Sequence, residues 1–151
     1  MDTTNEHNLA TFTHLSTLTQ YFIPFGNYIF PILIWTSKKN DSEFVDYHGK
    51  QALNFQLSLL LYSLVLAIIT TPIFIIAILK NIPLKAIINE EDFLANHLSI
   101  ENISGIVIVA LLAVIIFAGL KIAEFILIIY ASVKASNGEK YKYPFTITFI
   151  K

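Results

Sequence analysis

The feature that most constrains this chain is a pair of long segments almost free of charge. Residues 52–79 contain no Asp, Glu, Lys or Arg, and residues 106–133 contain only Lys121 and Glu124. Each segment has 28 residues, and a helix of that length, at about 1.5 Å per residue, exceeds the ~30 Å hydrocarbon core of a bilayer. Both segments therefore predict transmembrane helices, the first of them kinked at Pro72.

The composition points to the same class of protein. Hydrophobic residues make up 55% of the 151 residues and charged residues 14%, against about 45–50% and about 25% in soluble domains. A particle this small cannot hide so much apolar surface from water. The net charge is −1, all ten basic residues are lysine and cysteine is absent. We therefore expect a lipid bilayer as the main partner and no nucleic acid, and we do not expect a soluble enzyme or a disulfide scaffold.

A third apolar region, residues 9–35, is interrupted. Apolar residues recur with a helical period between Leu9 and Phe22, which predicts an amphipathic helix; they are Leu9, Phe12, Leu15, Leu18 and Phe22. The sequence Pro-Phe-Gly-Asn at residues 24–27 then breaks the pattern. Two interpretations remain open: one discontinuous span, or a re-entrant pair of half-helices. In either case lipid cannot satisfy the backbone groups freed at the break.

The other segments complete the expected architecture. Residues 82–103 mix apolar side chains with an acidic cluster, which predicts short interfacial helices, and residues 139–151 predict an extended interfacial tail. The expected fold is a single membrane domain over residues 1–151, an all-α integral membrane protein. It has two firm transmembrane helices, one broken or re-entrant N-terminal membrane segment, and interfacial helices between the two spans.

The lysines predict an orientation. They are concentrated between the first and second apolar regions and in the C-terminal tail, whereas the segment between the two long apolar stretches is mainly acidic. The positive-inside rule then predicts that the first loop and the C-terminus face the cytoplasm. The N-terminus is outside if the first region spans and inside if it re-enters.

Lys121 and Glu124 are the most distinctive polar residues inside a predicted span. They lie at i and i+3 on one helix face, and a lone charge at this depth costs at least ~2.5–3.5 kcal/mol. Three roles remain open: a mutual pair that locks helix packing, a contact with another chain, or part of a proton or ion pathway.

A polar helix-start motif precedes and enters the first long span, and it comprises Asp46, His48, Gly49, Lys50, Asn54 and Gln56. Asp46 and His48 are possible metal ligands, but two ligand types without a third make a poor metal site. We favour a polar helix start at the headgroup level, with Gly49 permitting a turn, and we expect no metal and no cofactor. The other histidines are expected on polar faces or the surface (His7, His14, His97), and an aromatic belt is expected at the inner interface (Trp35, Tyr130, Tyr141, Tyr143).

Catalytic signatures are missing from the sequence. It contains no G-x-S-x-G, no H-E-x-x-H and no phosphate-binding glycine loop. We therefore expect a non-enzymatic protein.

Three stretches carry a resemblance to a known family: residues 21–27, residues 44–56 and residues 131–145. The last contains a C-terminal motif of Lys134, Ser136, Asn137, Gly138, Tyr143 and Pro144. Together they resemble a family of small bacterial membrane proteins, the domain of unknown function forty-eight-seventy, which is similar to the Tic-twenty-like chloroplast import-channel component. The resemblance implies a small helical protein of the bacterial cytoplasmic (inner) membrane and, by analogy, a role in protein translocation or insertion.

These observations predict a multi-pass membrane protein that acts as a subunit or accessory factor of a membrane protein complex. Its expected partners are other membrane proteins, in a homo- or hetero-oligomer. The alternative is a small ion, proton or solute conducting protein that uses the Lys121/Glu124 pair.

Overall fold

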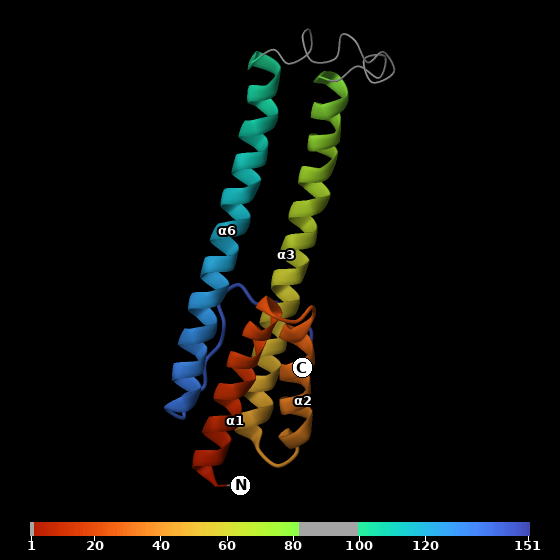
Figure 1. Cartoon of the computed structure of the whole chain (residues 1–151). Helices are drawn as coiled ribbons and strands as arrows, with labels where there is room; N and C mark the ends of the chain where they lie inside the picture. Colours follow the sequence, from red (N-terminus) through yellow and green to blue (C-terminus); the bar gives the residue numbers. More distant parts are fainter. Residues whose placement is uncertain (1, 82–99) are drawn as a thin grey trace. The chain divides into compact units, whose positions relative to one another are not determined.

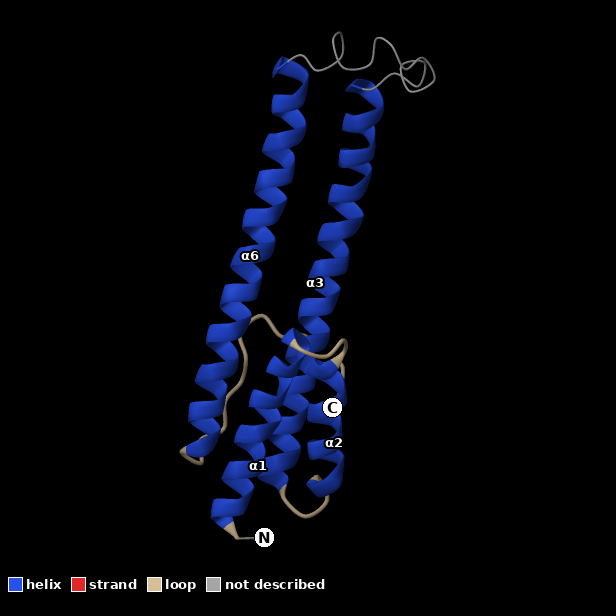
Figure 2. Cartoon of the chain, in the orientation of Figure 1, coloured by secondary structure: helices blue, strands red, loops and turns tan. Residues whose placement is uncertain are grey.

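The computed structural model describes residues 2–81 and 100–151, with side chains for residues 2–76 and 107–151. Its elements, in chain order, are α1 (Thr3–Ser16), the 3₁₀ helix η1 (Thr17–Tyr21), α2 (Gly26–Lys38), α3 (Glu43–Asn81) and α6 (Ile100–Ser136). The described part of the chain contains no strand (Figure 2), which confirms the all-helical prediction.

The chain forms two compact units. The first unit comprises Met1–Tyr62 and Lys121–Lys151, and the second comprises Ser63–Leu120. In the first unit α1 and α2 run antiparallel beside the first part of α3 and the last part of α6 (Figure 1).

The first unit buries many polar side chains and exposes many large apolar ones. Thr13, His14 and Glu124 are at most 1% exposed, whereas Phe12 and Phe22 are 59% and 87% exposed. Soluble proteins show the opposite distribution. The arrangement is the one expected of a protein surrounded by hydrocarbon, where polar side chains turn toward the protein interior.

The first apolar region begins with the helix α1. α1 buries Ala10, Thr13 and His14 and exposes Phe12. Phe12 on the apolar face therefore turns outward, and polar side chains of α1 pack on the neighbouring elements.

Two helical stretches are long and apolar enough to cross a membrane. They are Glu43–Ile76 in α3 and Val107–Ser136 in α6. Within the most apolar window, 0% of the α3 residues and 11% of the α6 residues are buried in protein. A core helix of a soluble protein would be mostly buried, so the two stretches fit the predicted transmembrane helices.

α3 begins earlier than expected. The Ser42 hydroxyl accepts a hydrogen bond from Val45 N (3.3 Å), and acidic residues in the first turn, Glu43 and Asp46, favour the positive end of the helix. The predicted loop before residue 52 is therefore helical. Gly49 makes no turn; its missing Cβ leaves room for the Trp35 ring.

α6 also begins earlier than expected, at Ile100. Residues 100–103 of the predicted interfacial segment are therefore the start of α6. The remainder of that segment, including His97, lies outside the described residues.

The tail after α6 lies along α3 without helical structure. Gly138, with φ of +76°, ends α6 in a left-handed conformation, and Glu139 N bonds back to Lys134 O (2.9 Å). Both ends of the Asn54 side-chain amide bind the tail. Its Oδ1 accepts hydrogen bonds from Phe149 N (3.0 Å) and Ile150 N (2.8 Å), and its Nδ2 donates one to Ile150 O (3.0 Å).

Two further α3 side chains bind the tail backbone. Ser58 Oγ accepts a hydrogen bond from Ile147 N (2.9 Å), and the Tyr62 hydroxyl donates to Phe145 O (2.6 Å). The tail backbone therefore finds its partners on one face of α3 and needs no strand of its own.

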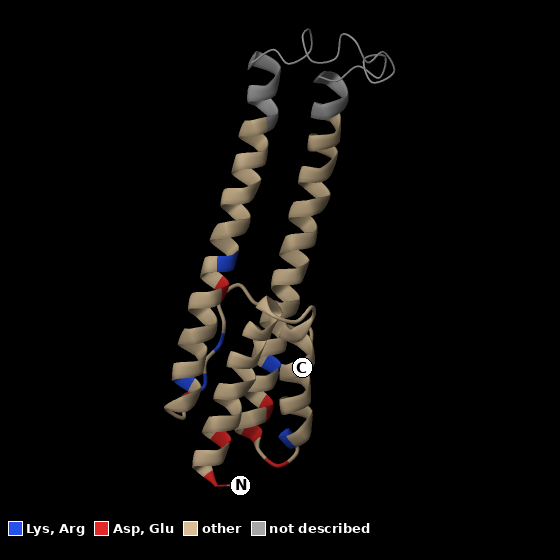
Figure 3. Ribbon diagram, in the orientation of Figure 1, with Lys and Arg blue, Asp and Glu red and all other residues tan. Residues whose placement is uncertain are grey.

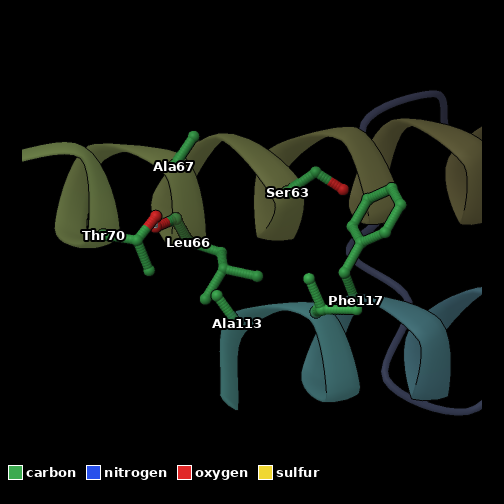
Figure 4. Close-up of a pocket in the computed structure, with 7 residues that line it drawn as sticks. Ser63, Leu66, Ala67, Thr70, Ala113 and Phe117 are labelled. Atoms are coloured by element: carbon green, nitrogen blue, oxygen red, sulfur yellow. Dashed lines mark hydrogen bonds between the residues drawn. The ribbon is translucent and has the colours of Figure 1, made fainter. Parts of the chain in front are cut away.

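The second unit contains a cavity of about 330 Å³ between the two long helices (Figure 4). The Thr70 hydroxyl donates a hydrogen bond to Leu66 O, one turn earlier in α3 (2.8 Å). Its methyl group is therefore the part of the side chain that faces the cavity. Small side chains on both helices leave this space, and it is mainly apolar. The lining residues are Ser63, Leu66, Ala67, Thr70, Ala113, Val114 and Phe117.

Replacing Gly49 by alanine is expected to destabilise the first unit. The new Cβ would overlap the Trp35 ring, so the ring and its hydrogen bond to Asp46 must shift, at a cost of about 1–3 kcal/mol. Gly119→Ala is the matched control, because nothing lies within 4 Å of a Cβ at that position. Thermal unfolding of the purified variants in detergent measures both, and equal melting temperatures would contradict the packing described.

Candidate functional site

The polar interior of the first unit is the candidate functional site. It contains a histidine cluster (His14, His48, Tyr143) and an amide–carboxylate cluster (Gln20, Lys121, Glu124). A third, amide-only contact joins Asn27 to Gln56. Each joins residues from different parts of the chain.

The histidine cluster connects α1, α3 and the tail. His14 Nε2 lies 2.8 Å from His48 Nδ1, and the Tyr143 hydroxyl lies 3.0 Å from His14 Nδ1. All three side chains are at most 2% exposed. Phe55 covers the cluster by stacking on Tyr143, with ring centroids 4.1 Å apart and planes 5° apart. Tyr143 is therefore a core residue, and its predicted place in an interfacial aromatic belt is wrong.

Two proton arrangements fit this cluster when both histidines are neutral. In one, Tyr143 donates to His14 and His14 donates to His48, which leaves a proton on His48 Nε2. In the other, every donor and acceptor is reversed. The Glu139 backbone lies near His48, but no hydrogen bond of ordinary geometry reaches Nε2. Within the part of the chain that the structure describes, the outer end of the cluster, His48 Nε2, therefore has no hydrogen-bond partner of ordinary geometry.

Burial determines the protonation of the cluster. Desolvation, followed by the nearby His48, lowers the pKa of His14 to about 3. Desolvation also raises the pKa of Tyr143 well above its usual value. Both groups are neutral at physiological pH, so the cluster contributes hydrogen bonds to the interior and no charge.

The amide–carboxylate cluster connects η1 to α6. Glu124 is 1% exposed, and both of its oxygens are engaged: Oε1 accepts from Gln20 Nε2 (2.7 Å) and Oε2 from Lys121 Nζ (2.8 Å). Lys121 also donates to Gln20 Oε1 (3.3 Å). The predicted pair therefore forms, and Gln20 completes it from another helix.

Asn27 fixes the start of α2 on α3. Its Nδ2 donates to Gln56 Oε1 (2.7 Å), and the Tyr28 hydroxyl donates to Gln56 O (3.3 Å). Gln56 is 1% exposed, and its Nε2 has no hydrogen-bond partner among the described residues. Gln56 therefore binds the α2 helix, whereas Asn54 binds the tail.

The remaining predicted site residues lie nearer the surface. Asp46 pairs with Lys50 (2.6 Å) and accepts from Trp35 Nε1 (2.8 Å), so it is turned toward α2 and away from His48. Lys134 pairs with Glu139, both partly exposed, and such pairs add little stability.

The C-terminal motif is divided between the surface and the core. Ser136 bonds Val133 O (2.8 Å), and Asn137 N bonds back into α6. Pro144 accepts a long hydrogen bond from Thr146 (3.4 Å). Gly138 packs under the His7 ring, so the motif both ends α6 and starts the tail.

Three residues of the site were not predicted: His14, Gln20 and Asn27. The signal was present, because polar residues recur on one face of α1 and flank the break at Pro24. This pattern identifies the three residues only if the polar face of a membrane helix is assumed to face the protein interior.

The chemistry open to this interior is limited. The described residues contain no group of three or more His, Asp or Glu side chains that could hold a metal ion. The histidine cluster can pass a proton along Tyr143, His14 and His48, whereas the amide–carboxylate cluster holds its carboxylate with two donors. The geometry is best suited to joining helices.

Removing the Glu124 carboxylate is expected to destabilise the first unit. Glu124→Leu removes the acceptor of Gln20 Nε2 and one of the acceptors of Lys121 Nζ, and a buried donor that loses its acceptor costs about 1–3 kcal/mol. Glu124→Gln retains one acceptor oxygen and should lose less than half as much. Thermal unfolding in detergent compares them. Wild-type stability of Glu124→Leu would show that the carboxylate does not hold the helices together.

Acid is expected to weaken the fold through His14. The unfolded chain binds a proton at His14 near pH 6.5, whereas the folded chain does so only near pH 3. Stability is therefore fully present above pH 6.5 and falls as the pH drops toward 3, by up to about 1.4 kcal/mol per pH unit. His14→Gln should show a shallower loss between pH 7 and 5 in thermal unfolding. An identical slope would mean that His14 does not contribute.

Comparison with known proteins assigns the family. The family model that matches covers residues 5–150 and describes the MamF/MmsF magnetosome magnetite crystal formation protein family. Nothing matches among the curated proteins or the solved structures. The resemblance to the domain of unknown function forty-eight-seventy and to the Tic-twenty-like component is therefore wrong, and its implied role in protein translocation has no support. Because the match takes in nearly the whole chain, this protein belongs to the MamF/MmsF magnetosome magnetite crystal formation protein family.

Proposed function

We propose that this chain is a non-enzymatic membrane protein that acts as a subunit or accessory factor of a membrane protein assembly. We further propose that this assembly takes part in magnetite crystal formation, the process that the family description gives. The proposed location is the membrane that surrounds the growing crystal.

The observation that carries the subunit role is an open face on α6. Gly119 and Ala123 are one turn apart and both are exposed, and a Cβ at Gly119 would meet nothing within 4 Å. Small residues at this spacing let a second helix approach closely within a bilayer. The polar side chains of the first unit are meanwhile turned inward, so contacts between chains depend on such apolar and small-residue faces.

The conducting alternative has less support from the geometry. Both oxygens of Glu124 accept hydrogen bonds, and the side chain is 1% exposed. A carboxylate held in this way is suited to locking η1 on α6.

Enlarging the open face is expected to disrupt assembly without unfolding the protein. Gly119→Leu fills space that the chain itself leaves empty, so the monomer should fold normally while a partner helix is displaced. Ile122→Leu, at a neighbouring position that is 62% exposed, is the control of conserved volume. Native co-purification in mild detergent with mass spectrometry measures the assembly. If wild-type chain is recovered only as a monomer, the subunit role is refuted.

Complementation tests the process. The chain is expressed in a magnetite-forming bacterium from which the members of this family have been deleted, and crystal diameters are measured by electron microscopy. We expect the wild-type chain to shift the diameters toward the parental distribution and Gly119→Leu to do so less. Unchanged crystals, with the protein present in the crystal-bearing membrane fraction, would contradict the proposed process.

A further inference from the structure

The turn between η1 and α2 exposes a cluster of large apolar side chains. Tyr21, Phe22, Ile23 and Phe25 are 53%, 87%, 45% and 73% exposed. We call this cluster, with Pro24, the hairpin tip. A contiguous apolar projection of this kind is unfavourable in water and marks a contact surface for apolar matter.

Several backbone groups of the tip are hydrogen-bonded within the protein. Phe22 N and Ile23 N both bond Thr19 O (3.0 and 2.8 Å), and Gly26 N bonds Ile23 O (3.0 Å). Pro24 has no N–H to satisfy. Phe25, with φ of +60°, turns the chain so that its carbonyl accepts from Tyr28 N (3.0 Å) and Ile29 N (3.1 Å). Non-helical backbone at membrane depth requires this kind of internal satisfaction.

Polar side chains beside the tip point into the protein. Gln20 reaches Glu124, and Asn27 reaches Gln56. A Cβ at Gly26 would lie 2.5 Å from Thr19 Oγ1, so η1 and α2 approach closely at the turn. The outer surface of the tip is left to the four apolar side chains.

Charge is confined to the opposite, open end of the hairpin formed by α1, η1 and α2. No Asp, Glu, Lys or Arg occurs between Glu6 and Lys38. The charged residues of this region flank that stretch and gather where α1 begins and α2 ends (Figure 3). They include Asp41, whose pKa the Lys38 ammonium lowers through a hydrogen bond. One end of the hairpin thus suits headgroups and water, and the other suits acyl chains.

The dimensions place the tip within the hydrocarbon. α2 has 13 residues, which at ~1.5 Å per residue gives about 20 Å, too short for a ~30 Å core. Gln20, next to the tip, bonds Glu124, so the tip lies at the level of Glu124 along α6. At the same rise per residue, Glu124 is about 18 Å from Ser136, where α6 ends. At the open end, His7 of α1 lies on Gly138 just after α6. The open end and the C-terminal end of α6 therefore share one level.

From these observations we infer that α1, η1 and α2 form a re-entrant hairpin whose tip contacts lipid acyl chains. The hairpin enters from the membrane surface at which α6 ends, and it returns to that surface before α3 begins. The N-terminus and the C-terminus then lie on the same side of the membrane. This inference does not depend on the function proposed above, and it selects one of the two interpretations that the sequence left open.

Cysteine labelling tests the hairpin, because the chain has no cysteine of its own. Single cysteines are placed at Thr4, at Lys151 and at Phe22, with Tyr21→Cys as a second tip position. Sealed membrane vesicles of known orientation are treated with a membrane-impermeant maleimide, before and after detergent. We expect Thr4→Cys and Lys151→Cys to be labelled from the same side, and both tip cysteines to react at least tenfold less until detergent is added.

Two results would overturn the inference. Labelling of Thr4→Cys and Lys151→Cys from opposite sides would show that the first region spans the membrane. Rapid labelling of both tip cysteines in intact vesicles would show that the tip lies in water. A nitroxide label gives an independent test. The Phe22→Cys protein is labelled in detergent and then reconstituted into bilayers. Collisions of the nitroxide with oxygen should be more frequent than collisions with a water-soluble nickel chelate, and the reverse ratio would refute acyl-chain contact.

Discussion

The structure of the first unit depends on one constraint: polar groups next to hydrocarbon must find partners within the protein. A side-chain donor or acceptor facing acyl chains has no water to bind, so its pairing decides which helix faces meet. Glu124 with Gln20 fixes η1 on α6, His14 with His48 fixes α1 on α3, and Asn54 fixes the tail. Many large apolar residues face outward, and a small buried cluster of Phe55, Ile128, Ala131 and Tyr143 packs beside the polar contacts.

The same constraint explains what could be predicted from the sequence. The long apolar segments and the break near Pro24 follow from composition and local chemistry, and the all-helical fold and two span-length helices agree with them. The Lys121/Glu124 pair was predictable because it is local, at i and i+3 on one helix. The partners of Glu124 and Tyr143 were not, because Gln20 and His14 lie more than a hundred residues away. The start of α3 was missed because Gly49 reads as a turn residue until Trp35 is placed against it.

Family membership changes the functional setting and leaves the physical interpretation intact. The expected link to protein translocation gives way to a family described by magnetite crystal formation, and the proposed role as a membrane-assembly subunit is compatible with that description. In the described interior, the side chains of His14 and Tyr143 are turned inward and neutral. The exposed surface of the long helices is mainly apolar, with the small-residue face at Gly119 and Ala123 as its distinctive feature.

Solvent accessibility along α1 and α6 tests the central claim most directly, namely that lipid surrounds the outward apolar faces of the first unit. Single nitroxides replace exposed positions, Phe12 and Phe125, and buried positions, Ala10 and Ile128, in chains reconstituted into bilayers. The account predicts frequent oxygen collisions and rare nickel-chelate collisions at Phe12 and Phe125, with few collisions of either kind at Ala10 and Ile128. Frequent nickel-chelate collisions at Phe12 and Phe125 would place these faces in water and contradict the account.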